Sequence, residues 1–202
     1  MSIAAAVLAA GAGRRFGADP KLLAPLADRP VLSWSLEAAL ASGLRPVLCV
    51  VGAHARRVTR VVPAGVAVVH ARRWRRGLAH SLRAGVSALE PWVQVEAVCV
   101  GLGDEPCIGP DAYQRLAAAY DGRAALWVAT YGGRRAHPVL IPRALWPAVH
   151  TVRGDVGARA LYGRVPVVEV PCDGTGSPVD VDTEADLAAV AEPGDPSREE
   201  RG

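Results

Sequence analysis

The stretch from Ile3 to Lys21 reads IAAAVLAAGAGRRFGADPK, and the rest of the chain is organised around it. Its first part, Ile3 to Ala10, is a short unbroken apolar run, which is typical of a strand buried on both faces of a parallel sheet. Gly11, Gly13 and Gly17 then break the run, and glycine lets the backbone approach a ligand closely. Successive N–H groups in such a turn form a concave anion site, and two arginines and a lysine add positive charge around it. The stretch therefore predicts a strand followed by a loop that binds a phosphate-bearing ligand.

This loop departs from two familiar phosphate-binding motifs. The dinucleotide fingerprint requires G-x-G-x-x-G, whereas the third glycine here comes one place late, at Gly17. Asp19-Pro20 then interrupts any helix, because the residue before proline avoids the α region. The Gly-Lys-Ser/Thr of a P-loop is absent. The sequence thus predicts a glycine-rich phosphate loop of another kind, with an ordinary tight turn and solvated arginines as the alternative.

Composition limits the classes of function. The chain has 202 residues, enough for one sizeable core, and 50% of them are hydrophobic. The net charge of +3 is small for this length, so charge alone does not indicate nucleic-acid binding. No apolar run approaches the length of a membrane span, and no Lys or Arg precedes the first run as in a signal peptide. We expect a cytoplasmic protein without nucleic-acid or membrane partners.

The four cysteines indicate no disulfide framework and no metal site. None of Cys49, Cys99, Cys107 and Cys172 forms a CxxC pair, and the first two lie inside apolar runs. We expect buried free thiols. Cys107 follows the predicted site directly, and its role stays open.

Apolar runs alternate with helical patterns almost throughout, which predicts an α/β domain with a mostly parallel sheet and helices on both faces. The section from Gly132 to Val139 is rich in turn residues and is expected to carry an antiparallel excursion. Residues 1–191 are predicted to form one Rossmann-like domain, and the charged residues 192–202 a disordered tail. The predicted strands are Ile3–Ala10, Pro46–Val51, Val66–His70, Ala97–Gly101, Leu126–Tyr131, Pro138–Ile141, Val165–Val170 and Val179–Asp182; the predicted helices are Ser33–Ala41 with a Ser33 cap, His54–Val61, Leu78–Leu89, Pro110–Tyr120, Arg143–Val149, Val156–Tyr162 and one capped by Thr183 that runs to Val190.

Acidic residues follow two of the predicted strands. Asp104 comes just after a buried strand, where a carboxylate is costly unless it has a cation or a hydrogen-bond partner. Ligands of open α/β sheets bind beyond the carboxyl ends of the strands, and Mg²⁺ uses one or two carboxylates plus the substrate's phosphates. Asp180 and Asp182 alternate, which predicts one common face of a strand. Turn capping at Asp104 and helix capping at Asp182 are the alternatives, and Glu105 is expected to point outward.

Several segments together resemble one family. Leu8-Ala9-Ala10-Gly11-x-Gly13-x-Arg15-Phe16-Gly17, followed by Lys21-Leu22-Leu23, is similar to the signature loop of the MobA-like nucleotidyltransferases, and within them most similar to molybdenum cofactor cytidylyltransferase. Gly103–Pro106 resembles a Gly-Asp-x-Pro motif, Asp180–Thr183 a DxDT-like segment, and Trp74–Gly85 the pattern W-x-x-G-x-x-x-S-L-x-x-G. The resemblance runs from Ile3 to about Leu187 and implies a fold of the nucleotide-diphospho-sugar transferase type.

This resemblance implies that CMP is transferred from CTP to a phosphate-bearing acceptor such as molybdopterin, with Mg²⁺ as cofactor and release of pyrophosphate. Lys21, Arg15 and Asp104 would be catalytic, and Asp104 and Asp182 would hold the Mg²⁺. His137 and Asp155 would lie on the acceptor side, and a molybdoenzyme or its chaperone would be the protein partner. The implied nucleotide-binding residues are Leu8, Ala9, Ala10, Gly11, Gly13, Arg14, Arg15, Lys21, Gly77, Ser81 and Leu82.

Two residue choices favour cytidine over guanosine as the base. Guanylyl-transferring relatives tend to carry a glycine where this chain has Ala10, and Ser81-Leu82 is similar to the cytidylyl-transferring members. A methyl group at Ala10 narrows the pocket, and a pyrimidine needs less room than a purine.

Two other functions stay open. The family includes members described as nicotine blue oxidoreductases, so a nicotinamide- or flavin-dependent oxidoreductase that uses the same loop is one alternative. The displaced Gly17 and the two metal-placed aspartates stand against it. The other is a module that binds a cofactor for delivery without turnover, against which the intact Lys21, Asp104 and Asp182 argue.

Overall fold

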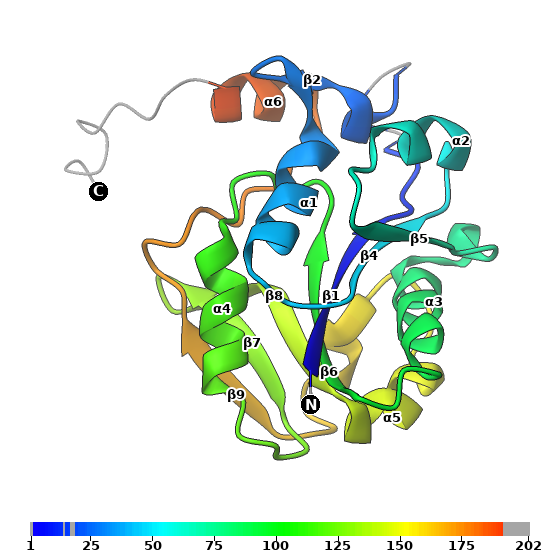
Figure 1. The fold of residues 1–202 in the computed structure, drawn as a ribbon. Helices are drawn as coiled ribbons and strands as arrows, with labels where there is room; N and C mark the ends of the chain where they lie inside the picture. The colour runs from blue at the N-terminus through cyan, green and yellow to red at the C-terminus, as the bar shows by residue number, and fades with distance from the viewer. Residues whose placement is uncertain (1, 14, 17–18, 192–202) are drawn as a thin grey trace.

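A seven-stranded sheet forms the centre of the computed structural model, which describes residues 2–13, 15–16 and 19–191 (Figure 1). The predicted loop residue Arg14, Gly17 and the predicted tail of residues 192–202 lie outside the described residues. Neighbouring strands are parallel except at β8, which runs antiparallel to both of its neighbours. The order across the sheet is β5 (Val66–His70), β4 (Val47–Val51), β1 (Ser2–Ala9), β6 (Val95–Leu102), β8 (Arg134–Pro142), β7 (Leu126–Tyr131) and β9 (Val167–Pro171).

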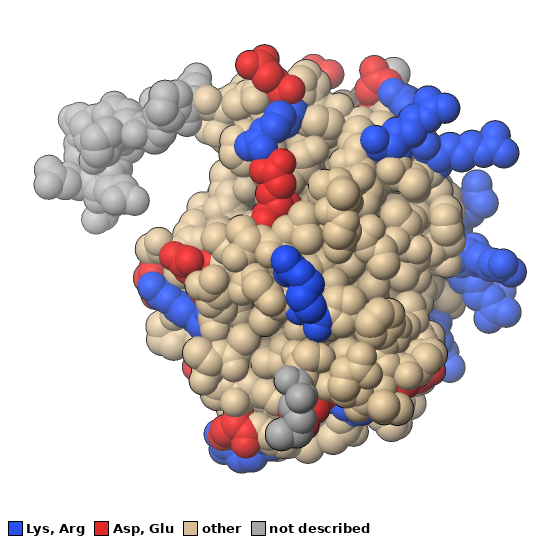
Figure 2. Space-filling view, in the orientation of Figure 1, with Lys and Arg blue, Asp and Glu red and all other residues tan. Residues whose placement is uncertain are grey.

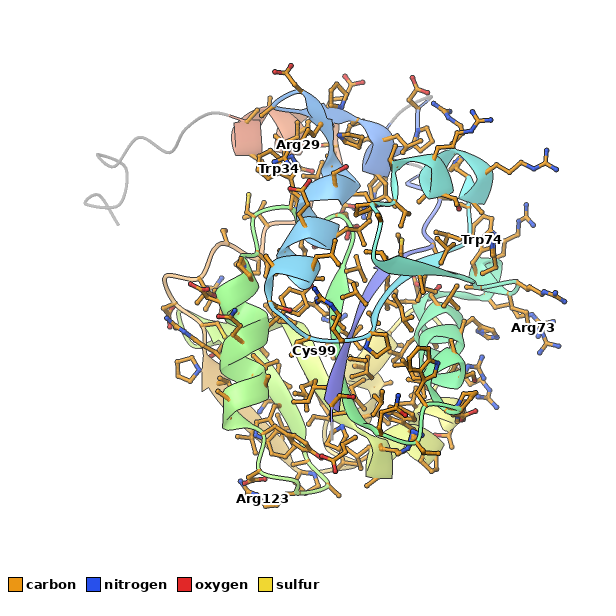
Figure 3. The ribbon with its side chains drawn as sticks, in the orientation of Figure 1. Arg29, Trp34, Arg73, Trp74, Cys99 and Arg123 are labelled. Carbon is orange, nitrogen blue, oxygen red and sulfur yellow. The ribbon has the colours of Figure 1, made fainter. Side chains whose placement is uncertain are left out.

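Strand β1 is apolar from Ile3 onward because helices cover both faces of the sheet. Ala4, Ala6 and Leu8 belong to the core cluster that includes α3 (Leu78–Leu89) and α5 (Trp146–Thr151). The alternate residues pack with α1 (Val31–Ala41) and α4 (Pro110–Ala119) on the other face. Cys99, on the neighbouring strand β6, is fully buried in this second layer (Figure 3). The predicted α/β class and the helices on both faces are confirmed.

The glycine-rich section after β7 forms the predicted antiparallel excursion. Gly132 and Gly133 both have positive φ, +54° and +73°, which a tight reversal requires of two successive residues. The chain then returns as β8, which is longer than the predicted Pro138–Ile141 and inserts between β6 and β7. This insertion brings the first residues of β8 to the carboxyl edge of the parallel strands.

Two local expectations are wrong. Residues 179–182 form no strand; their alternation arises because Val181 is buried against Phe16 and Val31 while its N–H donates to the Asp104 carbonyl (2.8 Å). Helix α1 begins at Val31 with no side-chain cap, so Ser33 lies inside the helix. The cause is the short β2–β3 hairpin (Pro25–Leu26 and Arg29–Pro30), which leads straight into the helix.

The remaining helices differ from prediction mainly at their ends. Helix α6 (Glu184–Ala191) has the predicted cap, since Thr183 Oγ1 accepts from the Asp186 N–H (3.2 Å) and the Asp186 carboxylate accepts from the Thr183 N–H (2.7 Å). Among the described helices, none is both long and apolar enough to cross a membrane. The other short elements are α2 (Ala55–Val58) and the 3₁₀ helices η1 (Lys21–Leu23), η2 (Thr59–Val61), η3 (Trp74–Arg76), η4 (Arg143–Leu145) and η5 (Gly157–Leu161).

Candidate active site

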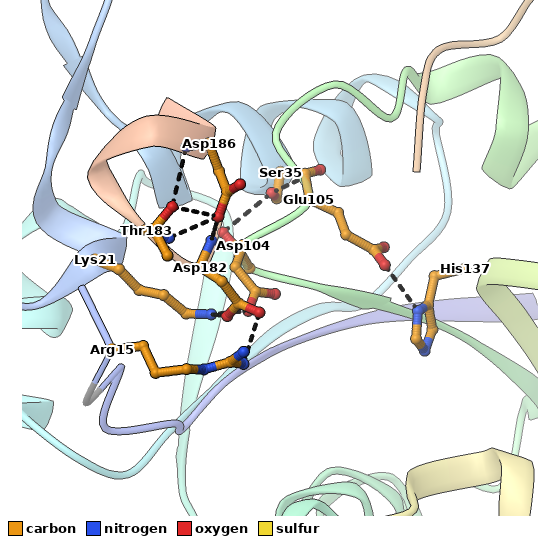
Figure 4. Close-up of polar contacts among 10 residues, drawn as sticks. Arg15, Lys21, Ser35, Asp104, Glu105, His137, Asp182, Thr183 and Asp186 are labelled. Atoms are coloured by element: carbon orange, nitrogen blue, oxygen red, sulfur yellow. Dashed lines mark hydrogen bonds and ion pairs between the residues drawn. The ribbon is translucent and has the colours of Figure 1, made fainter. Parts of the chain in front are cut away.

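A cluster of four charged side chains lies at the carboxyl edge of β1 and β6 (Figure 4). Lys21 Nζ donates to Asp104 Oδ2 and, over 2.8 Å, to Asp182 Oδ1. Arg15 NH2 donates to the other oxygen of Asp182 over 2.7 Å. These are the four residues for which the sequence predicts catalysis or metal binding, and the fold brings all of them together although they span 167 positions of the chain.

The glycine loop folds back over Lys21. Gly13 has φ of +59°, and a Cβ at this position would lie 3.0 Å from Lys21 Cγ, so any larger residue would push the lysine aside. The Lys21 side chain is only 11% exposed, whereas that of Arg15 is 75% exposed. The loop therefore fixes the lysine and leaves the arginine accessible to a ligand.

The electrostatics keep Lys21 charged. Burial alone would lower its pKa, but the carboxylates of Asp104 and Asp182 outweigh this effect and raise the pKa above 10.5. The Lys21 ammonium contacts both carboxylates, and the Arg15 guanidinium supplies the second positive charge that balances them. In the part of the chain that the structure describes, no group of three metal-ligating side chains exists. Two carboxylates still fit Mg²⁺, which takes its remaining ligands from water and substrate phosphates.

Two connected pockets border this cluster. The central pocket, of about 520 Å³, is lined by the end of β1, the glycine loop, Lys21, Asp104 and Asp182. The α3 pocket, of about 320 Å³, extends from the loop to Trp74, Gly77 and Ser81. Both share Ala10, Gly11 and Gly13, so a ligand held by the loop reaches both.

The wall of the α3 pocket depends on two close approaches. Gly77 has φ of +100°, and a Cβ there would lie 2.5 Å from the Gly154 carbonyl oxygen. Asp155 Oδ1 accepts a hydrogen bond of 2.9 Å from the Leu78 N–H and so caps α3. Asp155, predicted for the acceptor side, thus lines the pocket and also anchors the helix. Leu82, predicted to bind nucleotide, is 1% exposed in the core and lines neither the central pocket nor the α3 pocket.

Positive charge gathers beside the α3 pocket. The side of the molecule that carries α2, β5 and η3 shows most of the arginines visible in Figure 2. Arg73 directly precedes Trp74, the first residue of η3 (Figure 3). Such a one-signed surface raises the local concentration of an anionic ligand. The exposed arginines of this side are Arg56, Arg57, Arg60, Arg72, Arg73, Arg75 and Arg76.

Glu105 points inward, so the expectation that it points outward is wrong. It is 5% exposed, and its Oε1 contacts His137 Nδ1 over 3.0 Å (Figure 4). The insertion of β8 beside β6 brings His137 to this position, and the Ser35 hydroxyl fixes the turn through the carbonyls of Gly103 and Glu105, both at 3.3 Å. Sequence reasoning missed Glu105 because its partner lies 32 residues away on a strand whose place in the sheet no local pattern reveals.

The charge of Glu105 contributes to raised pKa values at His137 and Asp180. Burial alone would lower the pKa of His137, but Glu105, and more weakly Asp180 and Asp104, raise it above 6.5. Burial, followed by the charges of Glu105 and Asp104, raises the pKa of Asp180 to about 6. Glu105, His137 and Asp180 line the hairpin pocket, a cavity of about 360 Å³ between β8 and η5 that adjoins the central pocket.

The four cysteines are free thiols, and the expectation of buried thiols is confirmed for Cys49, Cys99 and Cys172 but wrong for Cys107. Cys107 is partly exposed, and burial raises the pKa of its thiol. A thiol with a raised pKa is a poor nucleophile. Cys107 therefore has no environment that would activate it.

The glycine loop, the lysine between two aspartates and the mixed sheet agree with one family model. Residues 5–169 match the MobA-like NTP transferase domain. The chain belongs to this family. The description of this family indicates a transferase of the nucleotidyl type with a nucleoside triphosphate as substrate.

Three similar proteins illustrate the breadth of this family. The nicotine blue oxidoreductase of Paenarthrobacter nicotinovorans is 34% identical over 191 residues, 88% of this chain and 90% of that protein. The crystal structure of Rv0371c from Mycobacterium tuberculosis H37Rv has a TM-score of 0.83 at 30% identity, covering 95% of this chain and 98% of that one; a complex of Rv0371c with manganese has also been solved. A nucleotidyl transferase from Methanothermobacter thermautotroptrophicus shares the fold, with a TM-score of 0.79 at 23% identity over 94% and 96% of the two chains.

Proposed function

We propose that this protein transfers CMP from CTP to a phosphate-bearing acceptor such as molybdopterin, with Mg²⁺ as cofactor and pyrophosphate as the second product. The observation that carries this proposal is the contact of Lys21 with both Asp104 and Asp182 beside a glycine loop. A phosphate cradle next to two converging carboxylates suits a triphosphate with a divalent cation. Delivery of the product to a molybdoenzyme or its chaperone belongs to the same proposal.

In this reaction an oxygen of the acceptor phosphate attacks the α-phosphorus of CTP. The new P–O bond forms as the bond to the β-phosphate oxygen breaks, and pyrophosphate carries away the negative charge. The loop N–H groups and Arg15 hold the phosphates in line, and Lys21 neutralises the charge that develops. Asp104 and Asp182 would hold the Mg²⁺, which would supply Lewis-acid stabilisation of the charge that develops on the triphosphate. Positioning and charge neutralisation account for most of the rate.

Lys21 must release part of its present contacts when the cation binds. Two carboxylates now share its ammonium, and a cation between them would take over that neutralisation. The freed Nζ then lies beside the central pocket, within reach of the triphosphate. The lysine thus serves as an internal counter-ion before binding and as a phosphate ligand afterwards.

A second function has one specific observation in its favour, the similarity to a protein named nicotine blue oxidoreductase. The sequence lacks the glycine spacing of a dinucleotide fold, and the carboxylates beside the loop would repel a pyrophosphate that brings no cation. Oxidation of NADH or NADPH, followed by absorbance with and without Mg²⁺, distinguishes the two functions. Oxidation of NADH or NADPH in the absence of Mg²⁺ would favour the oxidoreductase and contradict the proposed nucleotidyl transfer.

Calorimetric titration of the four ribonucleoside triphosphates in the presence of Mg²⁺ tests the proposal. We expect CTP to bind and GTP to bind at least roughly tenfold more weakly, a difference of about 1.4 kcal/mol. The reason is the size of Ala10, which lines both pockets that touch the loop. Equal affinity for CTP and GTP would remove cytidylyl transfer, and no binding of any triphosphate would remove nucleotidyl transfer altogether.

A further inference from the structure

The hairpin pocket lies on the far side of the central pocket from the nucleotide loop. The two cavities share Leu78, Leu102, Asp155, Arg159 and Asp180 along their border. The body of the hairpin pocket is lined by β8, η5 and the residue Glu105. Its volume of about 360 Å³ is in the range of small-molecule sites. An acceptor whose phosphate reaches the central pocket therefore has room for its remaining part here.

The wall of this pocket contains a buried oxygen without a partner. Glu105 is 5% exposed, and its Oε1 is occupied by His137. Within the described residues, Oε2 has no hydrogen-bond partner. A buried polar atom left unpaired costs about 1–3 kcal/mol, and more when it is charged. Native proteins rarely leave such an atom unpaired unless a ligand or water completes it.

The neighbours of Glu105 define which ligand group fits. Asp180, on the same wall, lies within hydrogen-bond reach of Glu105, so the two carboxyl groups can share a proton; when both are ionised, both are acceptors. His137 is already engaged with Oε1, and the guanidinium of Arg135 pairs with Glu169 (2.7 Å) and lies over the Tyr162 ring at 5.2 Å. An anionic group at Oε2 would face two carboxylates, whereas an N–H donor would satisfy the oxygen directly.

We propose that Glu105 Oε2 accepts a hydrogen bond from an N–H group of the acceptor, of the amide or amidine kind, in the part of the acceptor remote from its phosphate. This inference rests on the proposed nucleotidyl transfer for the identity of the ligand as the acceptor. Arg159, exposed at the border of the two pockets, attracts the acceptor phosphate. His137, which also lines this pocket, holds the Glu105 carboxylate in place through Oε1.

A matched pair of neutral probes tests the inference without the acceptor. Benzamide carries N–H donors, and N,N-dimethylbenzamide has none. We expect benzamide to bind the full-length protein at least tenfold more tightly, measured by ligand-observed NMR. In Glu105→Gln the side-chain carbonyl faces the His137 N–H and the NH₂ points into the pocket. The variant should then bind N,N-dimethylbenzamide at least as tightly as benzamide, a reversal that a size effect of the methyl groups would not produce.

Glu96→Gln is the control variant, since Glu96 lies on the same strand β6 but lines a separate cavity at its other end. It should keep the preference of the wild type. Equal binding of both probes by the wild type, or an unchanged preference in Glu105→Gln, would overturn the inference. If Glu105→Gln fails to fold, benzamide titrated into the wild type with labelled glutamate and histidine must shift the Glu105 and His137 resonances, and no shift overturns the inference. CTP binding, measured separately in both variants, should stay within about twofold, so that a failure of nucleotidyl transfer is recognised independently.

Discussion

Asp104 and Glu105 are neighbours in the chain, yet they belong to two halves of the site with opposite electrostatic designs. Asp104 faces Lys21, and together with Asp182 and Arg15 it forms a cluster in which each carboxylate has a cation. Glu105 faces His137, and one of its oxygens has no partner among the described residues. In the first half the charged groups pair with one another when no ligand is bound. In the second half one carboxylate oxygen is left for a ligand to bond.

The two halves also come from different parts of the sheet. The half around Asp104, which we propose binds the nucleotide (the nucleotide half), is built where parallel strands end, from the loop after β1 and the turn after β6. The half around Glu105, which we propose binds the acceptor (the acceptor half), is built by β8, the described strand that runs the other way, and by η5. We therefore expect residues of the first half to act in transfer of the nucleotidyl group to any acceptor. We expect residues of the second half to select the acceptor.

The largest effect is expected at Asp104. Asp104→Asn removes the charge but keeps the shape, so turnover should fall by on the order of 10²–10³-fold or more while the melting temperature changes little. Pyrophosphate release with CTP, Mg²⁺ and acceptor is the measurement. Asp121→Asn is the control, because Asp121 is an exposed residue paired with Arg123. Activity of Asp104→Asn within a few-fold of the wild type would contradict a catalytic role of Asp104, and with it the proposed difference between the two halves.

Lys21→Ala should have the next largest effect. Loss of a cation that acts in the transition state should lower kcat by on the order of 10²-fold and raise KM for the triphosphate much less. Steady-state kinetics separate the two constants. Arg29→Ala, which removes the exposed pair of Arg29 with Glu37, serves as control. An increase in KM with unchanged kcat would make Lys21 a binding residue only.

A smaller effect is expected for the choice of base. Ala10→Gly combined with Ser81→Ala removes the methyl and the hydroxyl that narrow the α3 pocket. The preference of about tenfold for CTP over GTP should then decrease, by less than about 1.4 kcal/mol. Calorimetry with both nucleotides checks this, with Ser87→Ala on the exposed side of α3 as control. A preference that stays at the wild-type value would move base selection elsewhere.

The smallest effect concerns pH and the acceptor half. Because folding raises the pKa of His137 above 6.5, the folded state binds this proton more tightly than the unfolded state. The stabilisation is complete below pH 6.5 and disappears as the pH rises through the folded-state pKa. The raised pKa of Asp180, about 6, also makes the free energy of unfolding decrease as the pH rises. This decrease takes place mainly below pH 6, so it adds little to the change above that pH. The free energy of unfolding should therefore still decrease above pH 6.5 in the wild type.

Glu105→Gln should reduce this decrease, because it removes the largest contribution that raises the pKa of His137 against burial and leaves only the weaker ones of Asp180 and Asp104. Urea denaturation between about pH 6.5 and 8.5 measures the difference, and NMR titration of the imidazole gives the pKa directly. Parallel profiles of wild type and Glu105→Gln would show that the pair does not set the pH dependence.

The nucleotide half could be predicted from sequence because its signals are local. An apolar run followed by Gly11 and Gly13 specifies a strand and a loop, and Asp104 follows directly on another apolar run. The acceptor half could not be predicted in the same way. The inward orientation of Glu105 depends on β8 lying beside β6, and strand order is a property of the whole sheet. Residues 179–182 show a further limit, because the burial of one residue, Val181, produces the same alternation as a strand.

The central position of β1 affects how the chain folds as it is made. β1 leaves the ribosome before both of the strands with which its edges pair, β4 and β6, which are made much later. At about 5–20 residues per second, roughly 4 to 20 seconds separate the synthesis of β1 from that of β6. During this interval one edge of an apolar segment has no strand to pair with. Such an exposed edge is a site for aggregation, so synthesis of β6 sets the earliest time at which the nascent chain is protected.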